Sequence, residues 1–118
     1  MFKGKKVLVL GLAKSGKAAV ELLKFMHADI TINESKKKED IPEYDTYVSE
    51  GIEMVCGGQP DELFERDFDF VVKNPGINYH APFILRLKER GIPVYTEIEL
   101  GYKVAKKQHY IAVTLVKS

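Results

Sequence analysis

The segment VLVLGLAKSGKAAVELLKFM, residues 7–26, decides the fold of this chain. It opens with an apolar run, residues 7–10, of the kind that forms a strand buried on both faces of a parallel sheet. Gly11 ends the run, and the apolar residues that follow recur at helical spacing, at positions 19, 20, 22, 23 and 26. Residues 28–33 then alternate and are rich in β-branched side chains, which predicts a second strand. The order strand, turn, helix, strand predicts a βαβ unit.

The rest of the chain continues this alternation. We expect strands at residues 52–56, 68–73, 92–95 and 109–114, and helices at residues 44–50, 60–64, 82–90 and 97–107. Pro93 places the fifth strand at an edge of the sheet, because proline cannot donate a ladder hydrogen bond. The pattern predicts an α/β fold, a three-layer, doubly wound, Rossmann-like domain with about five parallel strands.

Composition narrows the class of protein. The chain has 118 residues, 45% hydrophobic and 30% charged, which suits one compact soluble domain. The formal net charge is +1, so we expect neither nucleic acid nor a membrane as a partner. Cys56 is the single cysteine and cannot form an internal disulfide, and no secretory signal is recognisable near Met1, so we expect a cytoplasmic protein. We also expect it to be a monomer.

The turn after the first strand has a sequence typical of a phosphate-binding site. Residues 11–16, GLAKSG, approximate the dinucleotide fingerprint G-x-G-x-x-G, with Ala13 at the middle small position. Gly11 permits a tight turn, and Gly16 lets the helix pack against the strand. The N–H groups of Lys14, Ser15 and Gly16, with the helix dipole, then form an anion site. The alternative is a tight turn with a structural role only.

The end of the second strand leaves two kinds of nucleotide open. Asn33 and Glu34 follow the glycine turn by about 20 residues, where an acidic residue binds the ribose hydroxyls of a dinucleotide. On this interpretation the chain is a nicotinamide dinucleotide-binding module of an oxidoreductase or a regulator. Alternatively, Asn33 holds a base edge or a sugar, and the lysines at 36–38 either reach a phosphate or form a solvated loop.

A second turn lies at the same edge of the predicted sheet. Residues 73–77, KNPGI, follow the fourth strand at its carboxyl end, where ligands of open α/β sheets collect. Pro75 fixes one backbone dihedral of this turn, and we expect Gly76 to take a positive φ.

Four motifs in order carry a resemblance to a known family. They are residues 11–16 (GLAKSG), 73–77 (KNPGI), 91–94 (GIPV) and 96–100 (TEIEL). Their order and spacing resemble the N-terminal domain of the Mur ligases, in the branch that adds D-glutamate, over residues 4–114. The resemblance implies a role in peptidoglycan biosynthesis, with this domain binding the UDP moiety of UDP-N-acetylmuramoyl-L-alanine.

The resemblance also implies a set of binding residues. Backbone N–H groups around the start of the first helix would hold the diphosphate, two further segments would flank the uracil and ribose, and no catalytic or metal-binding residue is expected. The implied UDP-binding residues are Lys14, Ser15, Gly16, Asn33, Glu34, Ser35, Lys36, Asn74, Pro75, Gly76 and Ile77.

The family pattern implies further domains as well. Residues 1–108 would form the UDP-binding domain, and residues 109–118 would begin a central ATP-binding domain. The family continues there into a phosphate loop, but no G-x-x-x-x-G-K-[ST] sequence occurs in this chain. We therefore expect a truncated, inactive fragment of an ATP-dependent, amide-bond-forming ligase. ATP and Mg²⁺ would serve the full-length enzyme, none would bind this fragment, and its partners would be the substrate and its own central and C-terminal domains.

Several other residues are expected to be structural. Cys56 is expected to be a buried strand cysteine, and Tyr44 and Tyr47 are expected to pack rather than stack on a ligand. Glu97 and Glu99 are two residues apart and do not share a helix face, so a paired catalytic role is not expected. A helix-capping or interdomain role is expected for Glu97 instead.

Overall fold

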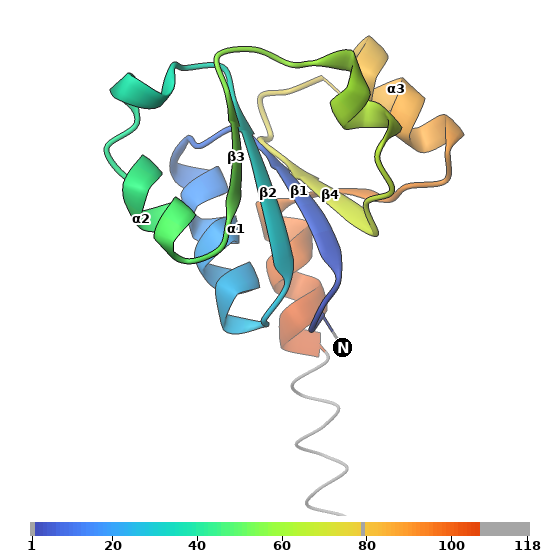
Figure 1. The fold of residues 1–118 in the computed structure, drawn as a ribbon. Coiled ribbons are helices and arrows are strands. Elements are labelled where there is room, and N and C mark those ends of the chain that lie inside the picture. The colour runs from blue at the N-terminus through green and yellow to red at the C-terminus, as the bar shows by residue number, and fades with distance from the viewer. Residues whose placement is uncertain (1, 79, 107–118) are drawn as a thin grey trace, which may run out of the picture.

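A five-stranded parallel sheet forms the centre of the domain (Figure 1). The structure, a computed structural model, describes residues 2–78 and 80–106. The strands are β1 (Lys6–Leu10), β2 (Asp29–Glu34), β3 (Glu53–Cys56), β4 (Phe70–Lys73) and β5 (Val94–Thr96). Their spatial order is β3-β2-β1-β4-β5, so the chain moves outward from β1 in one direction and then, from β4, in the other.

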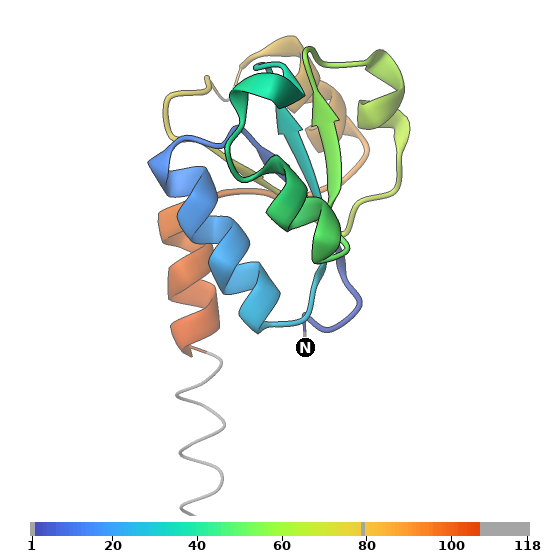
Figure 2. The ribbon, with the colours of Figure 1, turned by 60° about the vertical axis from the view of Figure 1, so that its left-hand side comes forward.

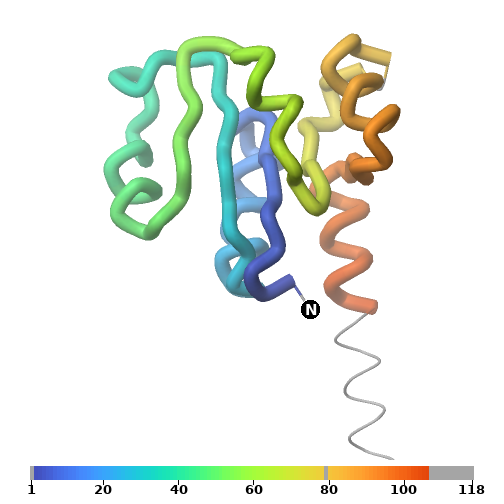
Figure 3. The backbone as a smooth tube through the Cα atoms, turned by 45° about the vertical axis from the view of Figure 1, so that its right-hand side comes forward, coloured from blue at the N-terminus to red at the C-terminus, as the bar shows by residue number. Residues whose placement is uncertain are grey.

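Helices cover both faces of this sheet, as in a doubly wound domain. A helix at residues 97–106 lies beside α1 (Lys14–Phe25) on one face, and α3 (Pro82–Glu89) and η2 (Asp61–Glu65) lie on the other (Figures 1 and 2). The end of this helix and the N-terminus lie toward the same end of the domain (Figure 3). The remaining helices are α2 (Tyr44–Ser49) and η1 (Lys38–Asp40), and both η1 and η2 are short 3₁₀ helices.

Each face of the sheet has its own apolar core. Side chains alternate across β1, so Val9 packs on one face with Leu23 and Leu100, while Leu10 packs on the other with Ile84. The buried positions of the first helix are those that the helical spacing indicates, which is why α1 docks against β1. This confirms the predicted three-layer, doubly wound α/β fold.

Three details differ from the sequence-based expectations. The helix at 97–106 is capped by Glu99 rather than Glu97: Oε1 of Glu99 accepts hydrogen bonds from the N–H and the hydroxyl of Thr96, and the Glu99 N–H donates to that hydroxyl. This is a capping box, because Thr and Glu stand three residues apart. Glu34 belongs to β2 itself, and Cys56 is only partly buried.

The fifth strand and Tyr47 lie where the sequence predicts. The fifth strand does lie at the sheet edge, where the N–H of Val71 donates to the carbonyl of Pro93 before β5 begins. Tyr47 is buried in the core, as expected for a packing residue. The expected strand at residues 109–114, and with it the domain boundary at 108, lies outside the described residues.

Candidate functional site

The candidate site lies where the strand order reverses, between β1 and β4. The connections that leave these two strands pass to opposite faces of the sheet, which opens a crevice at their carboxyl ends. Leu10 and Lys73 are register partners at the last position of the two strands. The glycine turn and the Asn-Pro-Gly turn therefore begin side by side at the position where doubly wound domains bind ligands.

The glycine turn presents free donors at the start of α1. Gly11 has a φ of +92°, and the Cβ of any larger residue at position 16 would lie 2.0 Å from the Gly11 carbonyl oxygen. Ala13 caps α1 without a side-chain hydrogen bond. The N–H groups of Lys14, Ser15 and Gly16 have no acceptor within residues 2–78 and 80–106. With the helix dipole, these three donors suit an anion.

Glu34 joins the glycine turn to the loop after β2. Its side chain is buried, with 8% of the residue exposed, and its Oε1 accepts the N–H of Leu12 at 2.9 Å. Its Oε2 accepts the N–H of Lys36 at 2.8 Å and the hydroxyl of Ser35 at 3.2 Å. Burial raises the pKa of this carboxyl group, but the hydrogen bonds and the nearby charge of Lys36 outweigh burial and leave the pKa below its usual range.

The side-chain amide nitrogen of Asn33 forms hydrogen bonds within the fold. The residue is 2% exposed, and Nδ2 donates to the carbonyls of Val55 at 3.0 Å and Gly58 at 2.7 Å. These two bonds hold the end of β3, and the turn at Gly57 and Gly58 that follows it, against β2. The side chain thus lies at the expected edge, with its donor used by the fold.

The turn after β4 is organised by a buried lysine. Lys73 is 2% exposed, and its Nζ donates to the carbonyls of Asn74 at 3.3 Å and Ile77 at 2.8 Å. The N–H of Ile77 donates back to the carbonyl of Asn74 at 2.9 Å. The turn is therefore fixed from both sides, and Pro75 and Gly76 are exposed at its tip.

The expectation of a positive φ at Gly76 is wrong. The glycines with positive φ in the described residues are positions 4, 11, 51, 57 and 91. Instead, Oδ1 of Asn74 accepts the N–H of Gly76 at 2.8 Å. This side-chain bond closes an Asx turn, which shapes the chain without a left-handed residue.

A small hollow lies beside the glycine turn and includes two expected site residues, Glu34 and Lys36. Its volume is about 40 Å³, and its other walls come from Leu12, Lys17 and residues 40–43. Lys17 forms an ion pair there with Glu43, with 2.8 Å between Nζ and Oε1. Sequence reasoning missed Lys17, although its place one residue after Gly16 in the first turn of α1 points to it.

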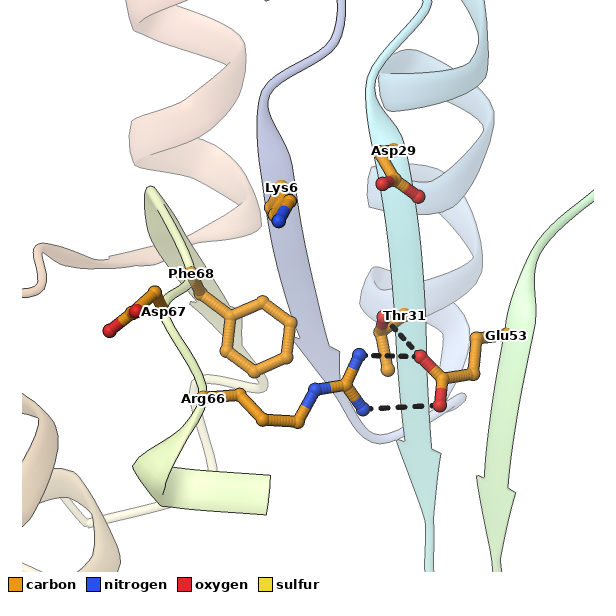
Figure 4. A pocket seen from close by; sticks show the side chains of 7 residues that line it. All are labelled: Lys6, Asp29, Thr31, Glu53, Arg66, Asp67 and Phe68. Carbon is orange, nitrogen blue, oxygen red and sulfur yellow. Dashed lines mark hydrogen bonds and ion pairs between the residues drawn. The ribbon is translucent and has the colours of Figure 1, made fainter. Parts of the chain in front are cut away.

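A larger hollow of about 350 Å³ lies at the opposite half of the sheet (Figure 4). Two of its charged side chains neutralise each other, because the Arg66 guanidinium bonds both oxygens of Glu53 at 2.6 and 3.1 Å, and this guanidinium also lies over the ring of Phe68. The Thr31 hydroxyl donates to the same carboxylate at 3.1 Å. This polar layer covers a part of the sheet and contains none of the nucleotide motifs, so we place the candidate site at the carboxyl edge.

The described residues give no sign of two other kinds of site. Among them, no group of three or more His, Cys, Asp or Glu side chains is arranged to hold a metal ion. Within the same residues, no helix has the length and apolar character to span a bilayer.

The family model for the Mur ligase MurD-like N-terminal domain matches residues 5–96. The chain belongs to this family. It is 50% identical over 104 residues to the UDP-N-acetylmuramoylalanine–D-glutamate ligase of Streptococcus thermophilus, covering 88% of this chain and 23% of that protein. It is 47% identical over 113 residues to the ligase of the same name from Streptococcus uberis, covering 96% of this chain and 25% of the relative. The chain thus spans about a quarter of the length of these relatives.

Solved structures show that the MurD-like domain shares its fold with dehydrogenases. Apo scyllo-inositol dehydrogenase from Lactobacillus casei superposes with a TM-score of 0.57 at 20% identity, over 81% of this chain and 28% of that chain. Shikimate dehydrogenase from Aquifex aeolicus gives a TM-score of 0.50 at 15% identity, over 83% of this chain and 44% of that chain. At these identities the likeness concerns the Rossmann-like fold alone.

Proposed function

We propose that this MurD-like domain binds the UDP moiety of UDP-N-acetylmuramoyl-L-alanine for a D-glutamate-adding ligase. One observation supports this most. Three free N–H donors at the start of α1 lie beside a rigid turn on the neighbouring strand, at the point where the strand order of the sheet reverses. Family membership and the name of the related ligases supply the identity of the nucleotide sugar.

The proposed site divides the nucleotide between three segments. The diphosphate lies at the N–H groups of residues 14–16, because backbone donors and the helix dipole there both favour negative charge. The uracil and ribose lie between residues 33–36 on one side and residues 74–77 on the other. The backbone and the exposed Ser35 and Lys36 side chains provide polar groups on the first side.

In the whole ligase this domain acts by positioning. A firmly held UDP restricts the distant acyl group of the substrate, which lowers the entropic part of the barrier to amide-bond formation. The 118 residues contain no G-x-x-x-x-G-K-[ST] sequence, so we assign ATP and Mg²⁺ to other domains of the ligase. We place the boundary between residues 1–108 and the beginning of the ATP-binding domain at 109–118, and this chain alone carries out no ligation.

The rival ligand is a nicotinamide dinucleotide. A dinucleotide site uses the acid at the end of the second strand to hold the ribose hydroxyls. Here both oxygens of Glu34 already accept hydrogen bonds from the chain itself, which favours the uridine nucleotide.

Thermal unfolding in the presence of nucleotides tests the proposal. The melting temperature of the 118-residue chain is measured with UDP, UMP, NAD and NADP at equal concentration. A ligand that binds the folded state alone raises the melting temperature. We expect UDP to give the largest rise and UMP, which lacks the second phosphate, a smaller one. A larger rise with NAD or NADP contradicts the proposal.

A further inference from the structure

The link between Glu34 and Leu12 continues the β1–β2 pairing beyond the backbone ladder. The ladder ends where the N–H of Gly11 donates to the carbonyl of Asn33 at 2.8 Å. Gly11 has a φ of +92°, so the chain turns at this point. The next N–H, that of Leu12, is taken by the Glu34 side chain at 2.9 Å. Residue 12 is thus held by a side chain two residues before the first free donor of α1.

The same carboxylate also fixes the chain after β2. Its Oε2 accepts the N–H of Lys36, and the carbonyl of Lys36 accepts the N–H of Gly57 at 3.0 Å. The carbonyl of Glu34 accepts that N–H as well, also at 3.0 Å. One buried carboxylate therefore joins two segments that face the proposed ligand, the glycine turn and residues 35–36.

We propose that Glu34 is a positioning residue of the nucleotide site, which acts on UDP through the Leu12 and Lys36 backbone without touching the nucleotide. The inference rests on the proposed function and refines the role of Glu34 within it. The side chain is only 8% exposed, and its three hydrogen-bond donors come from the chain itself. The acid at the end of the second strand thus shapes the site, whereas in a dinucleotide site it binds the ribose.

The charge of Glu34 is present at neutral pH, as this role requires. Burial raises the pKa of the carboxyl group, and the N–H groups of Lys36 and Leu12, the Ser35 hydroxyl and the Lys36 charge lower it further than burial raises it. Because the folded-state pKa lies below the unfolded value, the stabilisation is complete above the unfolded pKa and is lost as pH falls through the folded pKa. The hydrogen bonds that the Glu34 carboxylate accepts from Leu12, Ser35 and Lys36 are therefore in place near pH 7.

The substitution Glu34→Gln tests the role with little change of shape. The amide oxygen can still accept one N–H, but the NH₂ group cannot accept from Lys36 or Ser35. We expect the affinity for UDP to fall about tenfold or more, since a buried donor is left without its partner. Glu39→Gln is the matched control, because it removes the same charge from an exposed position in the same loop, and it should leave the affinity unchanged.

A second ligand separates positioning from direct contact. UDP and 2′-deoxy-UDP differ only in the ribose hydroxyl that a strand-end acid would bind. Positioning predicts that Glu34→Gln weakens both ligands by the same factor. A loss confined to UDP, with 2′-deoxy-UDP unaffected, would show a direct ribose contact and overturn the inference.

A measurement on the unaltered chain covers the case in which the variant does not fold. The carboxyl ¹³C resonance of Glu34 should stay in place when UDP saturates the domain, while the Leu12 and Lys36 amide resonances move. A carboxyl resonance that shifts with UDP but not with 2′-deoxy-UDP contradicts positioning. A native chain that binds no UDP contradicts the proposed function, whereas a native chain and a Glu34→Gln variant with equal affinity contradict only the role of Glu34.

Discussion

The carbonyl oxygen of Gly11 lies 2.0 Å from the point that a Cβ atom of residue 16 would occupy. The first turn of α1 can approach the end of β1 this closely only because residue 16 is glycine. We predict that Gly16→Ala destabilises the domain by about 1–3 kcal/mol, because the methyl group meets backbone that cannot turn aside. The glycine turn must shift to admit it, so UDP affinity should fall as well. Denaturant unfolding and a UDP titration measure the two effects.

The control for this variant is Gly101→Ala, in the helix at 97–106. A Cβ there meets nothing within 4 Å, and alanine is preferred over glycine inside a helix by roughly 0.5–1 kcal/mol. Gly101→Ala should therefore keep or raise the stability and leave UDP affinity unchanged. If the Gly16→Ala variant has the same stability and the same UDP affinity as the native chain, the prediction that residue 16 must be glycine is wrong.

Gly76→Val probes the second wall of the site. Gly76 does not need a positive φ, and a Cβ at this position meets only Oδ1 of Asn74 at 3.4 Å. We therefore expect a small loss of stability, about 0.5 kcal/mol or less as at other exposed positions, with a clear loss of UDP affinity because the methyl groups narrow the proposed uracil slot. Melting temperature and UDP affinity are compared on the same protein. Normal UDP affinity in a folded variant would leave residues 74–77 without a role in binding.

Lys73→Met tests whether the buried ammonium shapes that same turn. Methionine has a similar length but cannot donate to the carbonyls of Asn74 and Ile77. Loss of these hydrogen bonds should cost about 1–3 kcal/mol of stability and loosen the turn, which lowers UDP affinity in the folded fraction. Lys5→Met, at an exposed position, serves as the control for the change of side chain. Equal stability of the two variants would contradict the structural role of Lys73.

His27→Gly should stabilise the domain without affecting the site. His27 follows the end of α1 with a φ of +59°, and the N–H of Ala28 donates to the carbonyl of Leu23 in a Schellman motif. The left-handed conformation costs a side chain about 1–2 kcal/mol, part of which glycine loses again through its freer unfolded chain. We expect a net gain of about 0.5–1 kcal/mol in the free energy of unfolding. A lower melting temperature would contradict this account of the helix end.

The elements that follow from periodicity were predictable from the sequence. The apolar runs of β1 and α1 determine both the βαβ unit and the faces of its helix, and Pro93 correctly places β5 at the sheet edge. Glu34 shows the limit of this reasoning. The sequence places an acid at the end of a strand. Its carboxylate accepts the N–H of Leu12, 22 residues away in the chain, and the two residues meet only once the sheet has formed.

Two turns of the chain follow local rules that are visible in the sequence. The pattern Thr96-x-x-Glu99 is a capping box, and it favours Glu99 over Glu97 as the capping residue. Asn74 precedes Gly76 by two residues, the spacing of an Asx turn, and this side-chain bond replaces the positive φ that proline-glycine sequences often require. In both cases a side chain two or three residues away decides the backbone geometry.

The most direct test of the central claim is an amide chemical-shift map of the 118-residue chain titrated with UDP and, separately, with NAD. We predict that UDP shifts cluster at the carboxyl edge of the sheet, at Lys14, Ser15, Asn33 and Gly76, and that NAD at the same concentration causes smaller changes. Shifts centred on the Arg66–Glu53 hollow at the opposite half of the sheet, or a stronger response to NAD, would contradict it.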